Sequence, residues 1–94
     1  MEIHRIPVIS TGHLDRNTAD MFTQQGDDNP WCPCAQFQYG YFLYLDDPDS
    51  SPPPCLLDIR DWLRTQQAAG LITGGWVRLD SDADTVPDLP TYNW

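Results

Sequence analysis

The stretch from Ala35 to Leu45 constrains the fold more than any other part of the sequence. It reads Ala-Gln-Phe-Gln-Tyr-Gly-Tyr-Phe-Leu-Tyr-Leu. Apolar and polar residues alternate at first, and the last residues are apolar on both faces, as in the central strand of a sheet. The pattern therefore predicts one central strand over residues 35–45. A glycine inside a strand indicates a bulge or a close backbone approach, and we expect one of these at Gly40.

Two helices flank this strand in the sequence. The first is predicted over residues 16–25, with Asp15 as its N-cap. The second is predicted over residues 53–69 from apolar residues at i, i+3, i+4 and i+7, capped by Ser50 or Ser51. Each helix thus has one apolar face that must be buried against the sheet.

Shorter strands are expected at both ends of the chain, over residues 6–10 and 76–80. The resulting order is β-α-β-α-β, with room for a short extra strand at the end. We predict an α+β fold in which a three- to four-stranded sheet carries two helices packed on one face. At 94 residues, the chain forms one small domain spanning residues 1–94.

The charge balance is strongly acidic. Fourteen acidic and five basic residues give a formal net charge of −9. Such a surface repels nucleic-acid phosphates and attracts basic proteins, so direct nucleic-acid binding is not expected. The sequence also lacks an apolar stretch near the roughly 20 residues of a membrane span, and its start does not resemble a signal peptide. We expect a cytoplasmic protein.

The cysteines give weak support for a metal site. Cys32, Cys34 and Cys55, with His4 or His13, would supply four zinc ligands. The usual zinc spacing is C-x2-4-C in two pairs, however, and only one C-x-C occurs. Free cysteines often pack as small hydrophobic residues. The odd number of cysteines also favours reduced thiols. We expect neither metal nor cofactor.

Catalysis has no motif to support it. Ser10, His13 and Asp15 lie close together in sequence, yet no G-x-S-x-G nucleophile turn is present. Nucleotide-binding glycine motifs are missing as well. We therefore expect a protein that is not an enzyme, with His13 capping or packing at the entry of the first helix.

Three segments carry a family resemblance. They are Pro-Val-Ile-Ser-Thr-Gly-His-Leu from residue 7, Gln-Tyr-Gly-Tyr-Phe-Leu-Tyr from residue 38, and the ending from Val77 to Trp94. The "IST-H" start, "YGxF" strand and "LD-D-LP-Y-W" ending resemble a family of short, acidic, uncharacterised bacterial proteins of plasmids, prophages and other mobile elements. The Trp31–Cys34 segment is not part of this resemblance.

The resemblance and the charge together imply a function by binding. We expect a small mobile-element protein that binds and inhibits a basic nucleic-acid-handling host defence protein, of anti-CRISPR or anti-restriction type, by phosphate mimicry. The predicted contacts lie in one acidic loop, one acidic segment and the last residue. They are Asp46, Asp47, Asp49, Asp80, Asp82, Asp84, Asp88 and Trp94.

One further interpretation stays open at this point. The protein could be a non-catalytic accessory protein that forms a homodimer through exposed Trp31 and Trp94.

Trp76 is expected to complete the core. The segment after residue 80 is expected to be extended, so that Asp80, Asp82 and Asp84 point to one side, with Arg78 neutralising part of the cluster.

Overall fold

A four-stranded mixed sheet forms the centre of the domain. The computed structural model describes residues 1–47 and 49–93. The strands are β1 (Val8–Ser10), β2 (Cys34–Phe37), β3 (Gly40–Tyr44) and β4 (Trp76–Asp80). Their order across the sheet is β1-β4-β3-β2, with β1 parallel to β4 and the other neighbours antiparallel.

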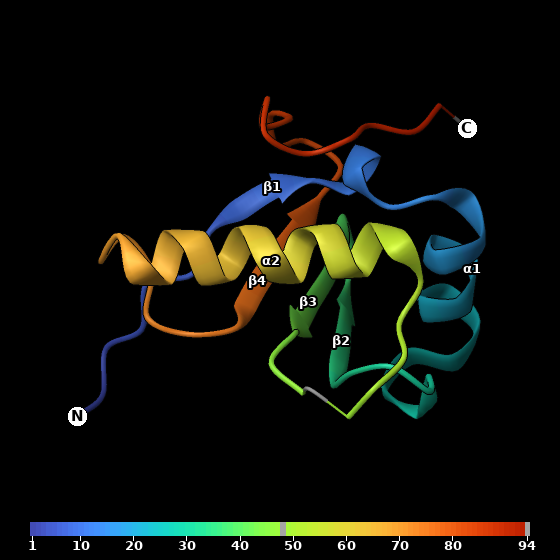
Figure 1. The fold of residues 1–94 in the computed structure, drawn as a ribbon. Helices are drawn as coiled ribbons and strands as arrows, with labels where there is room; N and C mark the ends of the chain where they lie inside the picture. The colour runs from blue at the N-terminus through green and yellow to red at the C-terminus, as the bar shows by residue number, and fades with distance from the viewer. Residues whose placement is uncertain (48, 94) are drawn as a thin grey trace.

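Two helices cover one face of this sheet. Helix α1 is Arg16–Gln25 and α2 is Pro54–Ala68. In Figure 1, α2 crosses in front of the strands and α1 stands beside the sheet at the end of α2 where that helix begins. Tyr41 on β3 reaches α1, because its hydroxyl donates a hydrogen bond to the Ala19 carbonyl over 3.1 Å. The predicted α+β fold with both helices on one face is confirmed.

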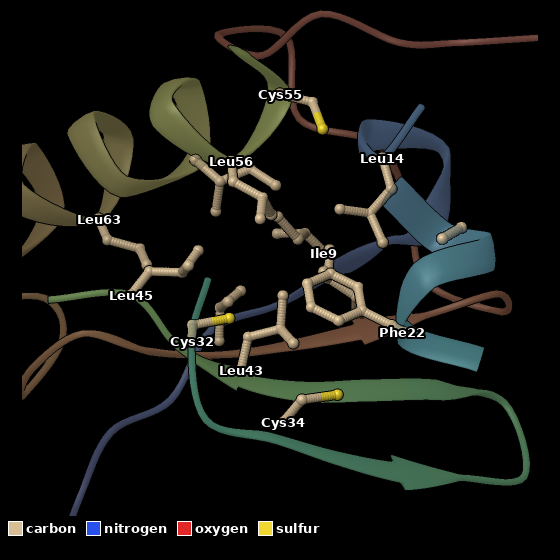
Figure 2. Close-up of a cluster of buried hydrophobic side chains, with 14 of the residues drawn as sticks. Ile9, Leu14, Phe22, Cys32, Cys34, Leu43, Leu45, Cys55, Leu56 and Leu63 are labelled. Carbon is tan, nitrogen blue, oxygen red and sulfur yellow. The ribbon is translucent and has the colours of Figure 1, made fainter. Parts of the chain in front are cut away.

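The core lies between the helices and the sheet. Strand register places Ile9 opposite Leu79 and Leu43 opposite Val77, so these four side chains point to the same face. All four are 1% exposed or less. The helices supply Ala19, Phe22, Cys55, Leu56, Ile59 and Leu63 to the same core. Figure 2 shows Leu56 and Leu63 of α2 above the sheet, with Phe22 of α1 closing one side.

The stretch predicted as one long strand is instead a hairpin. β2 ends at Phe37, Gln38 and Tyr39 make the turn, and β3 begins at Gly40 opposite Phe37. A Cβ at Gly40 would lie 1.8 Å from the Leu79 carbonyl oxygen, so only glycine lets the two backbones approach this closely. The close approach was predicted, and the turn was missed because it lacks the usual Asn-Gly or Asp-Gly pair. The fourth strand therefore comes from this hairpin.

The helix boundaries follow the sequence closely. The Asp15 carboxylate accepts a 2.7 Å hydrogen bond from the Thr18 backbone N–H, which confirms Asp15 as the N-cap of α1. The predicted Ser50 or Ser51 cap of α2 is wrong. Pro53 occupies that position and its side chain makes no capping bond. Pro54 then begins the helix, where its missing N–H costs nothing.

The segment after β4 passes over the end of β1 and the short helical turn of residues 11–13 that precedes α1 (Figure 1). Two of its main-chain bonds hold it against residues 10–12. The Ser10 N–H donates to the Asp84 carbonyl over 3.1 Å, and the Tyr92 N–H donates to the Gly12 carbonyl over 2.8 Å. Within the described part of this segment there is no further strand.

Candidate functional site

The two acidic regions predicted to contact a partner lie at opposite ends of the sheet. Asp46 follows β3, close to Gly75 at the start of β4, whereas Asp80 is the last residue of β4. A five-residue strand spans about 14 Å from first to last residue. The fold therefore does not bring the loop around Asp47 and the segment around Asp82 together into one surface.

Asp80 has an internal structural role. It is only 6% exposed, and its Oδ2 accepts a 2.7 Å ion-paired hydrogen bond from the Arg78 guanidinium. Its Oδ1 accepts a 2.9 Å bond from the Asp82 N–H. The Asp82 N–H and the Arg78 guanidinium hold the pKa of the Asp80 carboxyl below its ordinary value of 3.8.

The predicted extended geometry after residue 80 is wrong. The Ala83 N–H donates to the Asp80 carbonyl over 3.1 Å, which closes a turn directly after β4. The strand-like alternation of Asp80, Asp82 and Asp84 is thereby lost. The predicted neutralisation by Arg78 is present, but the carboxylate that it engages is that of Asp80 alone.

The loop after β3 keeps its carboxylates in solvent. Asp46, Asp47 and Asp49 are all exposed. Their bonds are local, because Asp47 accepts from the Asp49 N–H over 2.9 Å and Asp46 accepts from the Tyr44 hydroxyl over 3.4 Å. No Lys or Arg forms an ion pair with these three carboxylates within the described residues.

A groove lies between α2 and the C-terminal segment. It has a volume of about 500 Å³. Its walls are Asp58, Trp62, Thr65, Asp88, Leu89 and Pro90. Asp58 and Trp62 are four residues apart on α2, and therefore they face the groove from adjacent turns. Of the acids predicted as partner contacts, Asp88 is the one that the fold places here. Asp58 and Trp62 were not predicted as site residues.

His13 fixes the segment that forms one wall of this groove. The side chain is 1% exposed. Its Nδ1 lies 2.8 Å from the Pro90 carbonyl oxygen, and its Nε2 accepts a 2.9 Å bond from the Val86 N–H. These contacts require a neutral ring with the proton on Nδ1. The expected packing role of His13 is confirmed, because both ring nitrogens are occupied by main-chain groups.

The face of the sheet opposite the helices is rich in aromatic residues. Its side chains come from all four strands: Val8, Ala35, Phe37, Phe42, Tyr44, Trp76 and Arg78. The Arg78 guanidinium lies 4.8 Å from the Phe37 ring and 5.7 Å from the Phe42 ring. The rings of Tyr44 and Trp76 are 5.0 Å apart. The open face of a half-covered sheet is ordinarily polar, so this face is an exception.

The tryptophans differ from the predictions in one respect. Trp76 was expected in the core, but it lies on the open sheet face and is 36% exposed. The alternation of the strand decides its place, because Val77 points into the core. Trp31 is half-buried and packs edge-on against Phe22 at 5.8 Å. Trp94 lies outside the described residues.

The three cysteines are free and buried. Figure 2 shows Cys55 at the top of the core, near Leu14, while Cys32 and Cys34 lie toward the sheet. Burial raises the pKa of Cys32 to about 12 and that of Cys34 to about 11. Thiols with these pKa values stay protonated and behave as small apolar side chains.

Asn29 shapes the loop that leads to Cys32 and Cys34, and it was not predicted as a site residue. Its Nδ2 donates to the carbonyls of Gly26 and Cys32 over 2.7 and 2.8 Å. Its Oδ1 accepts from the N–H groups of Trp31 and Cys32 over 2.8 and 3.0 Å. The "Asp-Asp-Asn-Pro" run indicated a loop, but no sequence signal pointed to an asparagine with all four bonds satisfied.

The fold and surface define a small α+β domain with an acidic groove and an open aromatic sheet face. Residues 6–94 match the C-terminal domain of DUF5983, a family of unknown function, and the chain belongs to this family. Searches of curated proteins and of solved structures gave no match. Neither helix of the described residues has the length and apolar content of a membrane span. The function must therefore be argued from the surface itself.

Proposed function

We propose that this domain acts by binding, as a small acidic inhibitor of a basic, nucleic-acid-handling host protein. In this proposal the domain is encoded by a mobile element and blocks a defence nuclease of anti-CRISPR or anti-restriction type. Its carboxylates occupy positions on the target where nucleic-acid phosphates would otherwise lie. Acid groups placed in this way also steer association over long distances.

The observation that carries the proposal is the number of carboxylates without a cation. The chain has 14 acidic residues, and within the described residues only Asp20 and Asp80 form ion pairs with an arginine, while Glu2 contacts His4. Uncompensated like charges repel one another and work against the compact state. A basic partner would relieve that repulsion on binding.

The charges are arranged on separate surfaces. Asp46, Asp47 and Asp49 form an exposed loop at one end of the sheet, and Asp82 and Asp84 are exposed at the other end. The groove between α2 and the C-terminal segment adds a third group of charges. An inhibitor with this layout would engage basic residues at more than one point on its target, and affinity would fall as salt rises.

Retention on immobilised basic host nucleases tests the proposal. We expect a complex at low salt that weakens in high salt, and that weakens further when Asp46, Asp47 and Asp49 are changed to Asn. Glu2→Gln with Asp28→Asn and Asp61→Asn is the matched control, because it removes the same charge from exposed positions outside this loop. Binding that is unchanged by salt and by the Asn substitutions would rule out a role for the carboxylates.

The open aromatic sheet face favours a second candidate function. An accessory protein that works as a homodimer could cover this face with a second copy. Val8 and Trp76 are 49% and 36% exposed there, which is unusual for large apolar side chains on a sheet. This surface replaces the one first predicted for a dimer, because Trp31 packs against the core.

Sedimentation velocity separates the two candidates. A homodimer through the sheet face would form with rising concentration, persist in high salt, and dissociate in the Trp76→Ser variant. A monomer at all concentrations would remove the dimer hypothesis and leave the acidic surfaces as the candidate contacts.

A further inference from the structure

We propose that the groove between α2 and residues 88–90 binds an arginine side chain of a partner protein. The inference rests on the proposed function, because it names the chemical group that one acidic surface would recognise. It differs from that function in being confined to one groove.

The groove combines two kinds of surface. Trp62, Leu89 and Pro90 give apolar walls, while Asp58 and Asp88 place carboxylates along α2 and along the facing segment. Trp62 is half-buried and packs against the core, so its indole is held in one place. A ligand that fits must therefore offer both apolar surface and positive charge.

Among the described residues, no cation of the domain already fills this role. The ion pairs formed by Arg or His within the described residues involve Glu2, Asp20 and Asp80. Neither Asp58 nor Asp88 is among these partners. The carboxylates of Asp58 and Asp88 can therefore pair with a cation from a partner protein.

Arginine matches the groove better than other basic groups. A guanidinium is planar, stacks on an aromatic face, and donates hydrogen bonds to more than one carboxylate. Its aliphatic stem can pack along Leu89 and Pro90 while the charged end meets the acids. A lysine ammonium is a compact, strongly hydrated charge that gains less from a flat aromatic wall. The groove volume of about 500 Å³ also lies within the range of ligand pockets.

The wall of the groove is held in place before any ligand arrives. Leu89 is 7% exposed and belongs to the core cluster. His13 bonds to the backbone on both sides of Leu89, at Val86 and at Pro90. A preformed groove loses little conformational freedom on binding, which favours recognition of a single side chain.

Titration with three short peptides tests this inference. The probes are N-acetylated, C-amidated Gly-Arg-Gly, Gly-Lys-Gly and Gly-citrulline-Gly, followed by ¹⁵N–¹H NMR of the full 94-residue chain. Citrulline has the shape of arginine without its charge. We expect the arginine peptide to shift the Trp62 indole N–H and the Asp88 and Leu89 amides. Its affinity should be at least fivefold above that of the citrulline peptide, with lysine between them.

Two double variants show whether the affinity for the arginine peptide depends on the carboxylates of the groove. Asp58→Asn with Asp88→Asn should lower the affinity for the arginine peptide at least fivefold. Asp28→Asn with Asp61→Asn removes the same charge from exposed positions that do not line the groove, and affinity should stay within twofold. The dispersion of each spectrum shows whether the variant is folded.

Two results would overturn the inference. One is equal binding of the citrulline and arginine peptides. The other is an equal loss of affinity in both double variants, which would indicate a general charge effect. If the peptide test fails while the whole domain still binds a basic nuclease in a salt-dependent way, only the arginine groove is wrong. If the domain binds neither, the proposed function is wrong as well.

Discussion

Asp80 and Asp88 lie in the same acidic segment, and the fold uses them differently. Asp80 is 6% exposed, and both its oxygens accept hydrogen bonds inside the domain. Asp88 is exposed at the edge of a groove and forms no ion pair within the described residues. The same residue type therefore stabilises the domain at one position and is free to bind at the other.

Other polar side chains of the domain divide in the same way, into buried ones with internal hydrogen bonds and exposed ones. Asn29 and His13 resemble Asp80 in being buried and hydrogen-bonded inside the domain. The side-chain polar atoms of Asn29 and His13 all bond to backbone groups. Asp58 and the loop around Asp47 resemble Asp88, because their carboxylates are exposed. Changes in the first group should lower the free energy of unfolding, and changes in the second should affect binding with little effect on the fold.

Substitutions of Asn29 should give the largest loss of stability. Asn29→Ala removes four hydrogen bonds and leaves the N–H groups of Trp31 and Cys32 without their partner. We expect the free energy of unfolding in urea to fall by about 3 kcal/mol. Asn29→Asp keeps the acceptor but places a carboxylate oxygen against the Gly26 and Cys32 carbonyls, so its loss should be at least as large. A change below about 0.5 kcal/mol in Asn29→Ala would contradict the role assigned to this side chain.

His13→Phe should have the next largest effect. The substitution keeps an aromatic ring in the buried site, but it removes the bonds to Pro90 and Val86. We expect a loss of about 2 kcal/mol and faster amide hydrogen exchange for residues 84–92 than for β3. Exchange that accelerates equally in both regions would show that His13 does not specifically hold the C-terminal segment.

Asp80→Asn should lower stability in a way that depends on pH. The pKa of Asp80 is lowered in the folded state, so its carboxylate stabilises the domain above its ordinary pKa of 3.8. That contribution is lost as the pH falls through the lower folded value. The difference in free energy of unfolding between the wild type and the variant should therefore be present at pH 6 and shrink below about pH 4. A difference that is constant across this range would mean that the charge of Asp80 is not involved.

The double variant Asp82→Asn with Asp84→Asn should have the smallest effect on the fold. Both side chains are exposed, and the bonds that involve these residues in the turn are made by their backbone. We expect the fold to be kept and stability at low salt to rise by a few tenths of a kcal/mol, while partner binding weakens. Unfolding of this variant in a thermal melt would place these carboxylates among the structural ones.

The sequence predicted the helices and the last strand well because their signals are local. Apolar spacing located α2 to within a residue at each end, and the last strand lies at the predicted residues 76–80. Its inward face was not predicted, because Trp76 was expected in the core and Val77 and Leu79 lie there instead. The hairpin was missed for a physical reason. Gln38 and Tyr39 carry no turn signature, and the need for glycine at residue 40 comes from Leu79 on another strand.

The candidate site was predicted only in part, since it depends on tertiary contacts. Acidic composition led to the prediction of Asp88 as a contact, and the fold places it in the groove, whereas Asp58 and Trp62 looked like ordinary positions on an amphipathic helix. Only the path of the C-terminal segment brings these residues together. Composition also could not separate Asp80 from Asp82, because the turn that distinguishes them is set by hydrogen bonds at the end of β4.

The salt dependence of the free energy of unfolding shows whether the carboxylates of this domain lack cations. Raising NaCl from about 0.01 M to about 0.15 M shortens the Debye length from about 30 Å to about 8 Å. If most carboxylates lack a cation, the free energy of unfolding of the wild type should rise over this range, and that of Asp58→Asn with Asp88→Asn should rise less. A fall in wild-type stability with added salt would show that the acids are held in attractive pairs, which would contradict the account.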